Sequence, residues 1–222
     1  MDLNSCYIEN IGILMMTLPK NIELCLPVQA MEVSKVHLAP FKIITNRNPK
    51  PGVENRPIAP LSYVDGSIQL PCLSILLPNL RISRWDPMTG RIDLDLSPFP
   101  QIVNKLCTLQ DYIVNVVHHN QVQWLGQNDL DHETIRSLLQ PLIFNTTLTL
   151  FLHGPNPSLR PAGRAWIYQG GVWVRGSRPT SFFVGQEARI CVRLHGICLI
   201  PGRGTIIPKY RIQHQVISVA SK

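Results

Sequence analysis

The last third of this chain has almost no acidic residues. Residues 151 to 222 hold ten Lys or Arg against a single acidic residue, Glu187, whereas residues 1 to 150 hold eleven basic and thirteen acidic residues. The formal net charge of +7 therefore comes from the C-terminal third. A concentrated positive charge attracts polyanions, so nucleic acid is the first partner to consider.

The sequence also lacks a long hydrophobic run. A membrane-spanning helix needs about 20 consecutive apolar residues, and no segment approaches that length. The apolar run from Ile11 to Met16 is too short for a signal peptide, follows Asp2 and Glu9, and has no basic leader. We therefore expect a soluble intracellular protein, in the cytoplasm or nucleus, with no membrane partner; for a viral protein that compartment belongs to the host cell.

The six cysteines form no CxxC pair, which argues against a zinc site of that kind. Cys191 and Cys198 are an odd number of residues apart, so on one continuous strand they face opposite sides and a disulfide between them is not expected. The sequence predicts reduced, buried thiols. We expect no metal and no cofactor.

Motifs for catalysis are missing as well. Neither GxSxG nor HExxH occurs. Asp93 and Asp95 share a strand face, and Asp129, Asp131 and Glu133 lie close together, but helix capping explains the second cluster. We expect the protein not to be an enzyme and to have no small-molecule substrate.

The composition indicates a folded, mainly β protein. Hydrophobic residues make up 45% of the chain and charged residues 16%, which is typical of a globular protein. Nineteen prolines are more than a helical protein tolerates, because proline breaks helix interiors. The length of 222 residues fits one large domain or two small ones.

The first 60 residues are predicted to be an N-terminal β arm or extension. Short strands are expected at Ile11–Leu18, Ile22–Pro27 and Phe41–Thr45, separated by prolines. Residues 46–60 contain four prolines and are predicted to be a linker or mobile loop. A boundary near residue 60 would leave residues 61–222 as the main domain.

The middle of the chain combines strands and helices. A strand is expected from Ile68 to Leu77, and alternating residues predict a hairpin between residues 80–85 and 91–96. Apolar spacing predicts a helix over about 99–118, with Ser97 as its cap. A short helix is expected over about 132–139, with Asp131 as its cap.

The basic third is predicted to be almost entirely strand. A strand is expected at residues 148–152, a hairpin joins 165–168 to 172–175, and long strands follow at 187–200 and 209–219. Three strands, a helix and a further strand pair are typical of the oligonucleotide-binding (OB) fold. We therefore expect an OB-like five-stranded barrel with a helical insertion between strands and an N-terminal β extension.

Arginines and aromatic residues alternate between residues 160 and 183. Single-stranded nucleic acid needs flat side chains for base stacking and cations for its phosphates. The alternative that the aromatics are core residues and the arginines a solvated face stays open. The candidate residues in this stretch are Arg160, Arg164, Trp166, Tyr168, Trp173, Arg175 and Arg178, with Phe182 and Phe183 beside them.

A second basic row is expected on the strand from Glu187. Arg189 and Arg193 are four residues apart and share one strand face, while the opposite face, from Ile190 to Leu194, is predicted to be core. If the last two strands pair, Arg203, Lys209 and Arg211 extend this row. A charged ladder suits a phosphate groove, although it is also an ordinary way to keep a sheet soluble.

The order of elements in residues 97–222 resembles that of the OB-fold single-stranded DNA-binding proteins of large DNA viruses. The similarity rests on the helical segment PFPQIVNKL, the strands TLTLFL and ARICVRLHGICLI, and the closing strand KYRIQHQVISV after a basic loop. It covers a little over half of the chain and transfers no individual functional residue.

These patterns predict a protein that binds single-stranded DNA or RNA without sequence preference, in replication, recombination or repair. A homo-oligomer stays open. An alternative is a viral coat protein of jelly-roll type, whose basic surface faces a packaged genome. A third is a protein-interaction adaptor with an incidental basic face.

Overall fold

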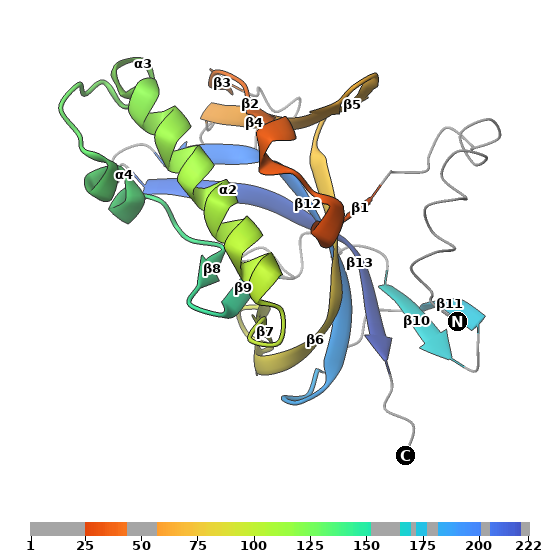
Figure 1. Ribbon diagram of the computed structural model, residues 1–222. Coiled ribbons are helices and arrows are strands. Elements are labelled where there is room, and N and C mark those ends of the chain that lie inside the picture. The colour runs from red at the N-terminus through yellow and green to blue at the C-terminus, as the bar shows by residue number, and fades with distance from the viewer. Residues whose placement is uncertain are drawn as a thin grey trace, which may run out of the picture.

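The structure is a computed structural model, and it describes residues 25–43, 57–151, 165–169, 172–176, 182–200 and 205–218. For residues 165–169, 172–176, 209 and 211–218 the description is limited to the backbone. Figure 1 shows a strongly curved sheet with one long helix lying across it.

The described residues are mainly β, as the sequence predicts. The strands are β1 (Leu26–Pro27), β2 (Val36–Leu38), β3 (Lys42–Ile43), β4 (Pro57–Asp65), β5 (Ile68–Leu70), β6 (Leu73–Asp86), β7 (Arg91–Asp95), β8 (Ile143–Phe144), β9 (Thr147–Phe151), β10 (Ala165–Gln169), β11 (Val172–Gly176), β12 (Glu187–Ile200) and β13 (Thr205–Ser218). The helices are η1 (Val28–Ala30), η2 (Val33–Lys35), α2 (Pro100–His119), α3 (Gln121–Leu125) and α4 (His132–Leu138).

Most strand pairs are antiparallel, and the central path through the sheet runs β11-β10-β13-β12-β6-β7-β9-β8. Two pairs, β1 with β6 and β10 with β13, are parallel. Strand β12 is long enough to pair with β6 through its first half and with β4 through its second. Among the described strands the pairing does not close into a ring.

Strands β6 and β7 form the predicted hairpin, with Asp86 paired to Arg91 at its end. The Asp86 carboxylate accepts hydrogen bonds from the backbone N–H of Met88 and the hydroxyl of Thr89, at 2.9 and 2.7 Å. These bonds hold the pKa of Asp86 below its usual value. The turn is therefore stabilised locally, which is why its sequence predicts it well.

Prolines determine where β6 begins and where it bends. The expected strand from Ile68 to Leu77 is divided into β5 and β6 at Pro71, and β6 then continues through Pro78. Around Pro78, β6 has one residue more than the part of β12 with which it pairs. The alternation of buried residues therefore shifts by one position between Leu77 and Leu80. A proline cannot donate to the ladder, so it favours this β-bulge.

The long helix confirms the predicted one, but its start differs. Phe99 is the N-cap of α2, and Pro100 is its first residue. Ser97 is not the cap, because it lies two residues before the N-cap position; its backbone N–H donates to the Asp95 carboxylate at 2.8 Å. A further short helix, α3, was not predicted; it ends at Gly126, whose φ of 71° few other residues adopt readily.

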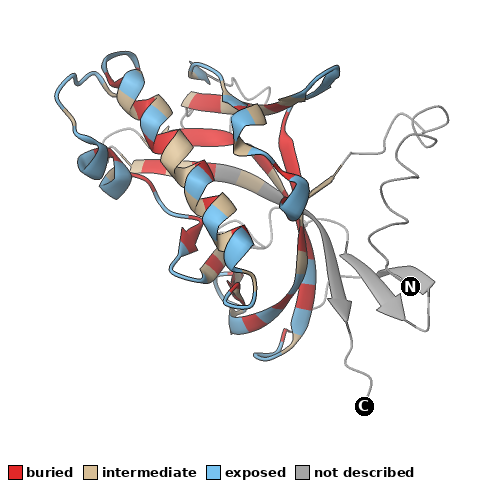
Figure 2. Cartoon of the chain, viewed as in Figure 1, coloured by how far each residue is buried: buried red, intermediate tan, exposed pale blue. Residues whose placement is uncertain are grey.

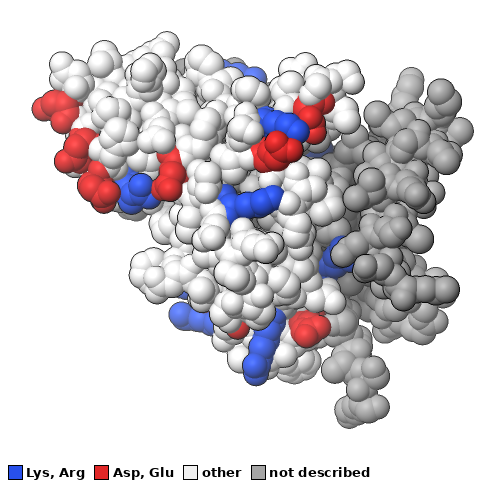
Figure 3. Space-filling model, in the orientation of Figure 1, with Lys and Arg blue, Asp and Glu red and all other residues white. Residues whose placement is uncertain are grey.

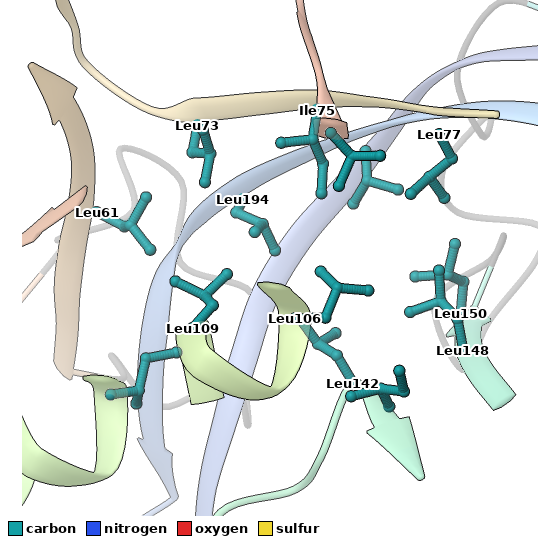
Figure 4. Close-up of a cluster of buried hydrophobic side chains, with 14 of the residues drawn as sticks. Leu61, Leu73, Ile75, Leu77, Leu106, Leu109, Leu142, Leu148, Leu150 and Leu194 are labelled. Carbon is teal, nitrogen blue, oxygen red and sulfur yellow. The ribbon is translucent and has the colours of Figure 1, made fainter. Parts of the chain in front are cut away.

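The apolar face of α2 packs against the concave side of the sheet (Figure 4). Leu106 and Leu109 project from the helix toward Leu73 of β6 and Leu194 of β12, all at most 3% exposed. Figure 2 shows the opposite side of the helix exposed to solvent. The spacing that predicts the helix thus also identifies the residues in its interface with the sheet.

Residues 25–43 pack on the same body as the later strands. Val28, Met31 and Val36 belong to the hydrophobic core, and Lys105 on α2 donates to the carbonyl oxygens of Gln29 and Met31. Strand β3 confirms part of the expected Phe41–Thr45 strand. The expected Ile11–Leu18 strand lies outside the described residues.

The predicted loop over residues 46–60 is shorter than expected at its C-terminal end. Residues 57–60 already belong to β4, which pairs with β2, β3, β5 and β12. Because of these pairings the strand includes two prolines. The proline-rich composition of the segment predicts a loop and gives no indication of this strand. The division into residues 1–60 and 61–222 stays a prediction.

The short helix α4 begins as predicted, with the Asp131 carboxylate accepting a hydrogen bond from the Thr134 N–H at 2.7 Å. We expect Asp131→Ala to lower the free energy of unfolding by about 1 kcal/mol, because a helix N–H loses its partner. Urea denaturation measures this change. Asp129→Ala removes the same charge nearby without removing the cap, so an equal loss in both variants would contradict the capping role.

Candidate nucleic-acid interface

The two strand pairs of the C-terminal third form as predicted. Strand β12 has the expected bounds, and β13 begins four residues earlier than expected and pairs with it along its length. Strands β10 and β11 form an antiparallel hairpin, and β10 joins the sheet beside β13. The basic third is therefore one edge region of the main sheet (Figure 1).

The face of β12 that the sequence predicts to be core is buried. Ala188, Ile190, Val192 and Leu194 are at most 3% exposed and face the core. Arg189, on the opposite face, is exposed, and Arg193 is half-buried. We call this opposite side of the sheet the outer face and define it by the sheet positions of Asn79, Arg81, Glu187, Arg189 and Arg193.

The strand register extends the outer face to the aromatic hairpin. Arg189 is paired with Val216 of β13, Val216 with Trp166 of β10, and Trp166 with Arg175 of β11. Residues paired in this way occupy the same face of neighbouring strands. Arg189, Trp166 and Arg175 therefore hold positions in one row across four strands.

Two further aromatic positions belong to the same face. Tyr168 is paired with Trp173, and each lies two residues from a member of the row, Trp166 or Arg175. Because alternate residues of a strand share a face, all four predicted positions of this hairpin lie on one side. From the sequence, Trp166 and Tyr168 share a face of one strand, and Trp173 and Arg175 share a face of the next. Only the register shows that both pairs lie on the same side of the hairpin.

The remaining candidates divide into two groups. Arg193 is paired with Arg211, and Gly196 with Lys209, so these two residues of β13 continue the register beside β12. Ser74, paired with Arg193, is only 1% exposed, so the outer face is covered at this end of β6. Arg160, Arg164, Arg178 and Arg203 lie outside the described residues.

Sequence reasoning missed two exposed arginines of β6, Arg81 and Arg84. Arg81 is paired with Glu187 and with Asp95, next to the row that contains Arg189. Hydrogen bonding to Ser97 lowers the pKa of Asp95, and the positive charge of Arg81 adds to this effect. The alternation of residues 80–85 already puts Arg81 on the solvent side, so the signal was present in the sequence.

The two neighbouring phenylalanines have different environments. Phe182 is 5% exposed and packs edge-on against Trp85, with 4.7 Å between ring centroids. Phe183 is 66% exposed, in a turn closed by a hydrogen bond from the Gln186 N–H to the Phe183 carbonyl. The N–H of Gly185 also donates to Ile82, which attaches this turn to β6. Core packing thus accounts for Phe182, whereas Phe183 offers a free aromatic ring.

Asp93, one of the two carboxylates of β7, is buried and held by hydrogen bonds. Asp93 is 5% exposed and accepts hydrogen bonds from the Arg91 guanidinium at 2.9 Å and the Thr149 hydroxyl at 2.8 Å. Both partners hold it within the β7–β9 pair. Such a carboxylate is occupied and screened from solvent, which fits a sheet-stabilising role better than acid–base catalysis.

Acidic side chains gather on another part of the surface. In Figure 3 they lie over α4 and the loop before it. Asp111 of α2 pairs there with Arg136 at 2.6 Å. This acidic area consists of Asp111, Asp129, Asp131 and Glu133. All four residues belong to the first 150 residues of the chain, in which acidic residues outnumber basic ones.

Within the ranges that the structure describes, no group of three or more His, Cys, Asp or Glu side chains is arranged to hold a metal ion. In the same ranges, no helix has the length and apolar character needed to cross a membrane.

Tyr210 of β13 hydrogen-bonds to β9 and is a largely buried titratable group. Its hydroxyl accepts a hydrogen bond from the Phe151 N–H at 2.8 Å, and burial raises its pKa to about 12. A pKa above the unfolded value of 10.0 stabilises the fold below pH 10, and this contribution is lost as the pH rises toward 12.

We expect the free energy of unfolding to fall by about 2 kcal/mol across that interval because of Tyr210. Urea denaturation between pH 9 and 12, compared with Tyr210→Phe, measures the difference between the two slopes. Parallel pH profiles for the two proteins would contradict this role of Tyr210.

Comparison with protein-family models, with curated proteins and with solved structures found no match for this chain.

Proposed function

We propose that this protein binds single-stranded nucleic acid, DNA in the first instance, on the outer face of the sheet, without sequence preference and without catalysis. The observation that carries the proposal is the row of register-paired positions from Arg189 through Trp166 to Arg175. Tyr168 and Trp173 occupy the same face. A protein with this activity would serve replication, recombination or repair inside the cell.

The chemistry of these side chains suits an extended strand of nucleotides. Each base has a flat π-face, and stacking it on an aromatic ring contributes about 1–3 kcal/mol whatever the base. Arginines alongside contact phosphates without reading sequence. Exposed Arg81, Arg84 and Phe183 extend this combination of cation and aromatic ring to the end of β6.

The order of pairing is compatible with an OB-like barrel. Strands β6, β7 and β9 pair in sequence, and β12 returns to pair with β6 before β13. In an OB-like arrangement, the bridge between Leu139 and Ile206 and the bond between Phe151 and Tyr210 would lie where the barrel closes. Helix α2 lies between the second and third of these strands, so the proposed fold is a variant of the arrangement seen in viral single-stranded DNA-binding proteins.

Fluorescence anisotropy of labelled oligonucleotides at about 50 and 200 mM salt tests the proposal. We expect the single strand to bind more tightly than the duplex. For five phosphate contacts, the affinity should fall about a hundredfold between the two salt concentrations. Absence of binding at the lower concentration would overturn the proposal; large particles in light scattering without such binding would favour the coat-protein alternative.

A further inference from the structure

Cys191 is an exception among the outer-face positions of β12. Its neighbours on that face, Arg189 and Arg193, are exposed and half-buried, whereas Cys191 is 2% exposed. The Sγ atom of Cys25 lies 2.7 Å from its Sγ atom, although 166 residues separate the two in sequence. The thiol is therefore covered on the solvent side by a residue from the N-terminal part of the chain.

Strand pairing places both cysteines close to Ile75 of β6. Ile75 of β6 is paired both with Leu26 of β1 and with Val192 of β12. Cys25 and Cys191 each precede one of these two partners. Because β1 is parallel and β12 antiparallel to β6, the register alone leaves the two cysteines on opposite edges of β6. The short distance between the sulfur atoms shows that Cys25, which lies just before β1, reaches across β6 to Cys191.

We propose that Cys25 and Cys191 are a site of reversible oxidation, which a small disulfide such as oxidised glutathione converts into an intramolecular disulfide bond. Neither cysteine forms a disulfide bond in this structure, so both sulfur atoms are at the thiol level. A disulfide bond is about 2.05 Å long, so the two sulfur atoms need to approach by roughly 0.6 Å. In a reducing compartment such a bond is characteristic of regulation rather than of permanent support.

The reaction proceeds by two thiol–disulfide exchanges. Half-buried Cys25 loses its proton and attacks one sulfur of oxidised glutathione, forming a mixed disulfide and releasing one glutathione thiolate, which takes up a proton. Cys191 then loses its proton and attacks the Sγ atom of Cys25, which breaks the mixed disulfide and releases a second glutathione. Two electrons pass from the cysteine pair to glutathione, and the two protons end on the glutathione thiols.

The environment makes the first exchange slow. Sharing a hydrogen bond with Cys191 raises the pKa of Cys25 far above its usual value, burial raises it further, and the charge of Arg189 opposes both effects. Little thiolate is present at neutral pH, and the thiolate is the attacking species. The pair therefore responds to sustained oxidising conditions.

The bond would join residues 25 and 191 and so close a very long loop. Constraint of the unfolded chain increases with loop length, so we expect the oxidised protein to melt on the order of 10 °C higher than the reduced protein.

The test treats the folded, full-length protein with oxidised glutathione and then counts free thiols by alkylation under denaturing conditions. We expect two of the six cysteines to become unreactive, a non-reduced peptide map to contain the Cys25–Cys191 linkage, and dithiothreitol to restore both thiols. The linkage should disappear in Cys25→Ser and Cys191→Ser and persist in Cys107→Ser.

A stable mixed disulfide with glutathione, six reactive thiols after treatment, or a linkage between other cysteines would each overturn the proposal. Because Cys191 is buried, Cys191→Ser can also weaken the fold. Cys25→Ser changes a half-buried residue just before β1, so it tests the linkage independently. These results do not depend on nucleic-acid binding, and the proposed function can fail while the linkage is found.

Discussion

Gly196→Ala is expected to lower the free energy of unfolding by about 3 kcal/mol or more, enough to unfold much of a protein of ordinary stability. Gly196 has a φ of 145°, a conformation that side chains with a Cβ rarely adopt. A Cβ at this position would lie 2.0 Å from the carbonyl oxygen of Ala59. The obstacle is backbone, so it cannot move aside as a flexible side chain would.

The close approach results from the way β12 changes partners. Gly196 is paired with Pro60 of β4 and follows His195, the extra residue in the pairing with β13. A β-bulge bends its strand locally, and at this point β12 leaves β6 and begins to pair with β4. A larger residue here would separate β4 from β12 and disrupt the core beneath Ala59.

Gly66→Ala and Gly126→Ala are matched controls for this prediction. Both glycines have positive φ, 57° and 71°, but nothing lies within 4 Å of a Cβ placed at either. Each should cost about 1 kcal/mol from backbone conformation alone. Urea denaturation of the three variants separates the cost of the backbone conformation from the cost of the contact between the Cβ atom and Ala59. If Gly196→Ala lowers the free energy of unfolding no more than the two controls, that contact is not the cause.

Reversing two charges on the outer face should abolish most nucleic-acid binding. We expect Arg81→Glu combined with Arg189→Glu to weaken binding to single-stranded DNA by at least a hundredfold at about 50 mM salt, because two phosphate contacts become repulsive. The slope of log K against log salt should fall by about 1.4. Both residues are exposed, so neither substitution changes the packing of the core.

Lys42→Glu combined with Arg136→Glu is the control for net charge. It changes the charge by the same amount on β3 and α4, two exposed sites away from the aromatic hairpin. Fluorescence anisotropy should show nearly unchanged binding for this variant. Equal weakening by both double variants would indicate attraction by net charge alone, and an unchanged salt slope in Arg81→Glu/Arg189→Glu would contradict phosphate binding on the outer face.

Local signals predicted several elements well. Apolar spacing identified α2, the Asp131 cap identified the start of α4, and alternation with turn residues identified the β6–β7 and β10–β11 hairpins. Each of these depends on neighbours within a few residues, because helix faces, caps and tight turns are determined over that distance. The predictions failed where pairing with a distant strand decided the result, as for residues 57–60 of β4 and for Pro78 within β6.

The candidate site was predictable only in part, for the same reason. The sequence indicates that Trp166 and Tyr168 share a strand face, and that Arg189 and Arg193 share another, since alternation is a property of one strand. It does not indicate whether the two faces coincide. That depends on the register of β10, β12 and β13, in which a slip of one residue would reverse the relation.

The sequence by itself determined the mainly β character, the charge difference between the two parts of the chain, and the position of α2, because composition and short-range periodicity are sufficient for these. Tertiary structure alone decided that Gly196 must lie against Ala59, that Cys25 lies on Cys191, and that arginine and aromatic positions from four strands occupy one face. In each case the partners are distant in sequence. Their meeting depends on strand order, register and bulges, which only the packed sheet specifies.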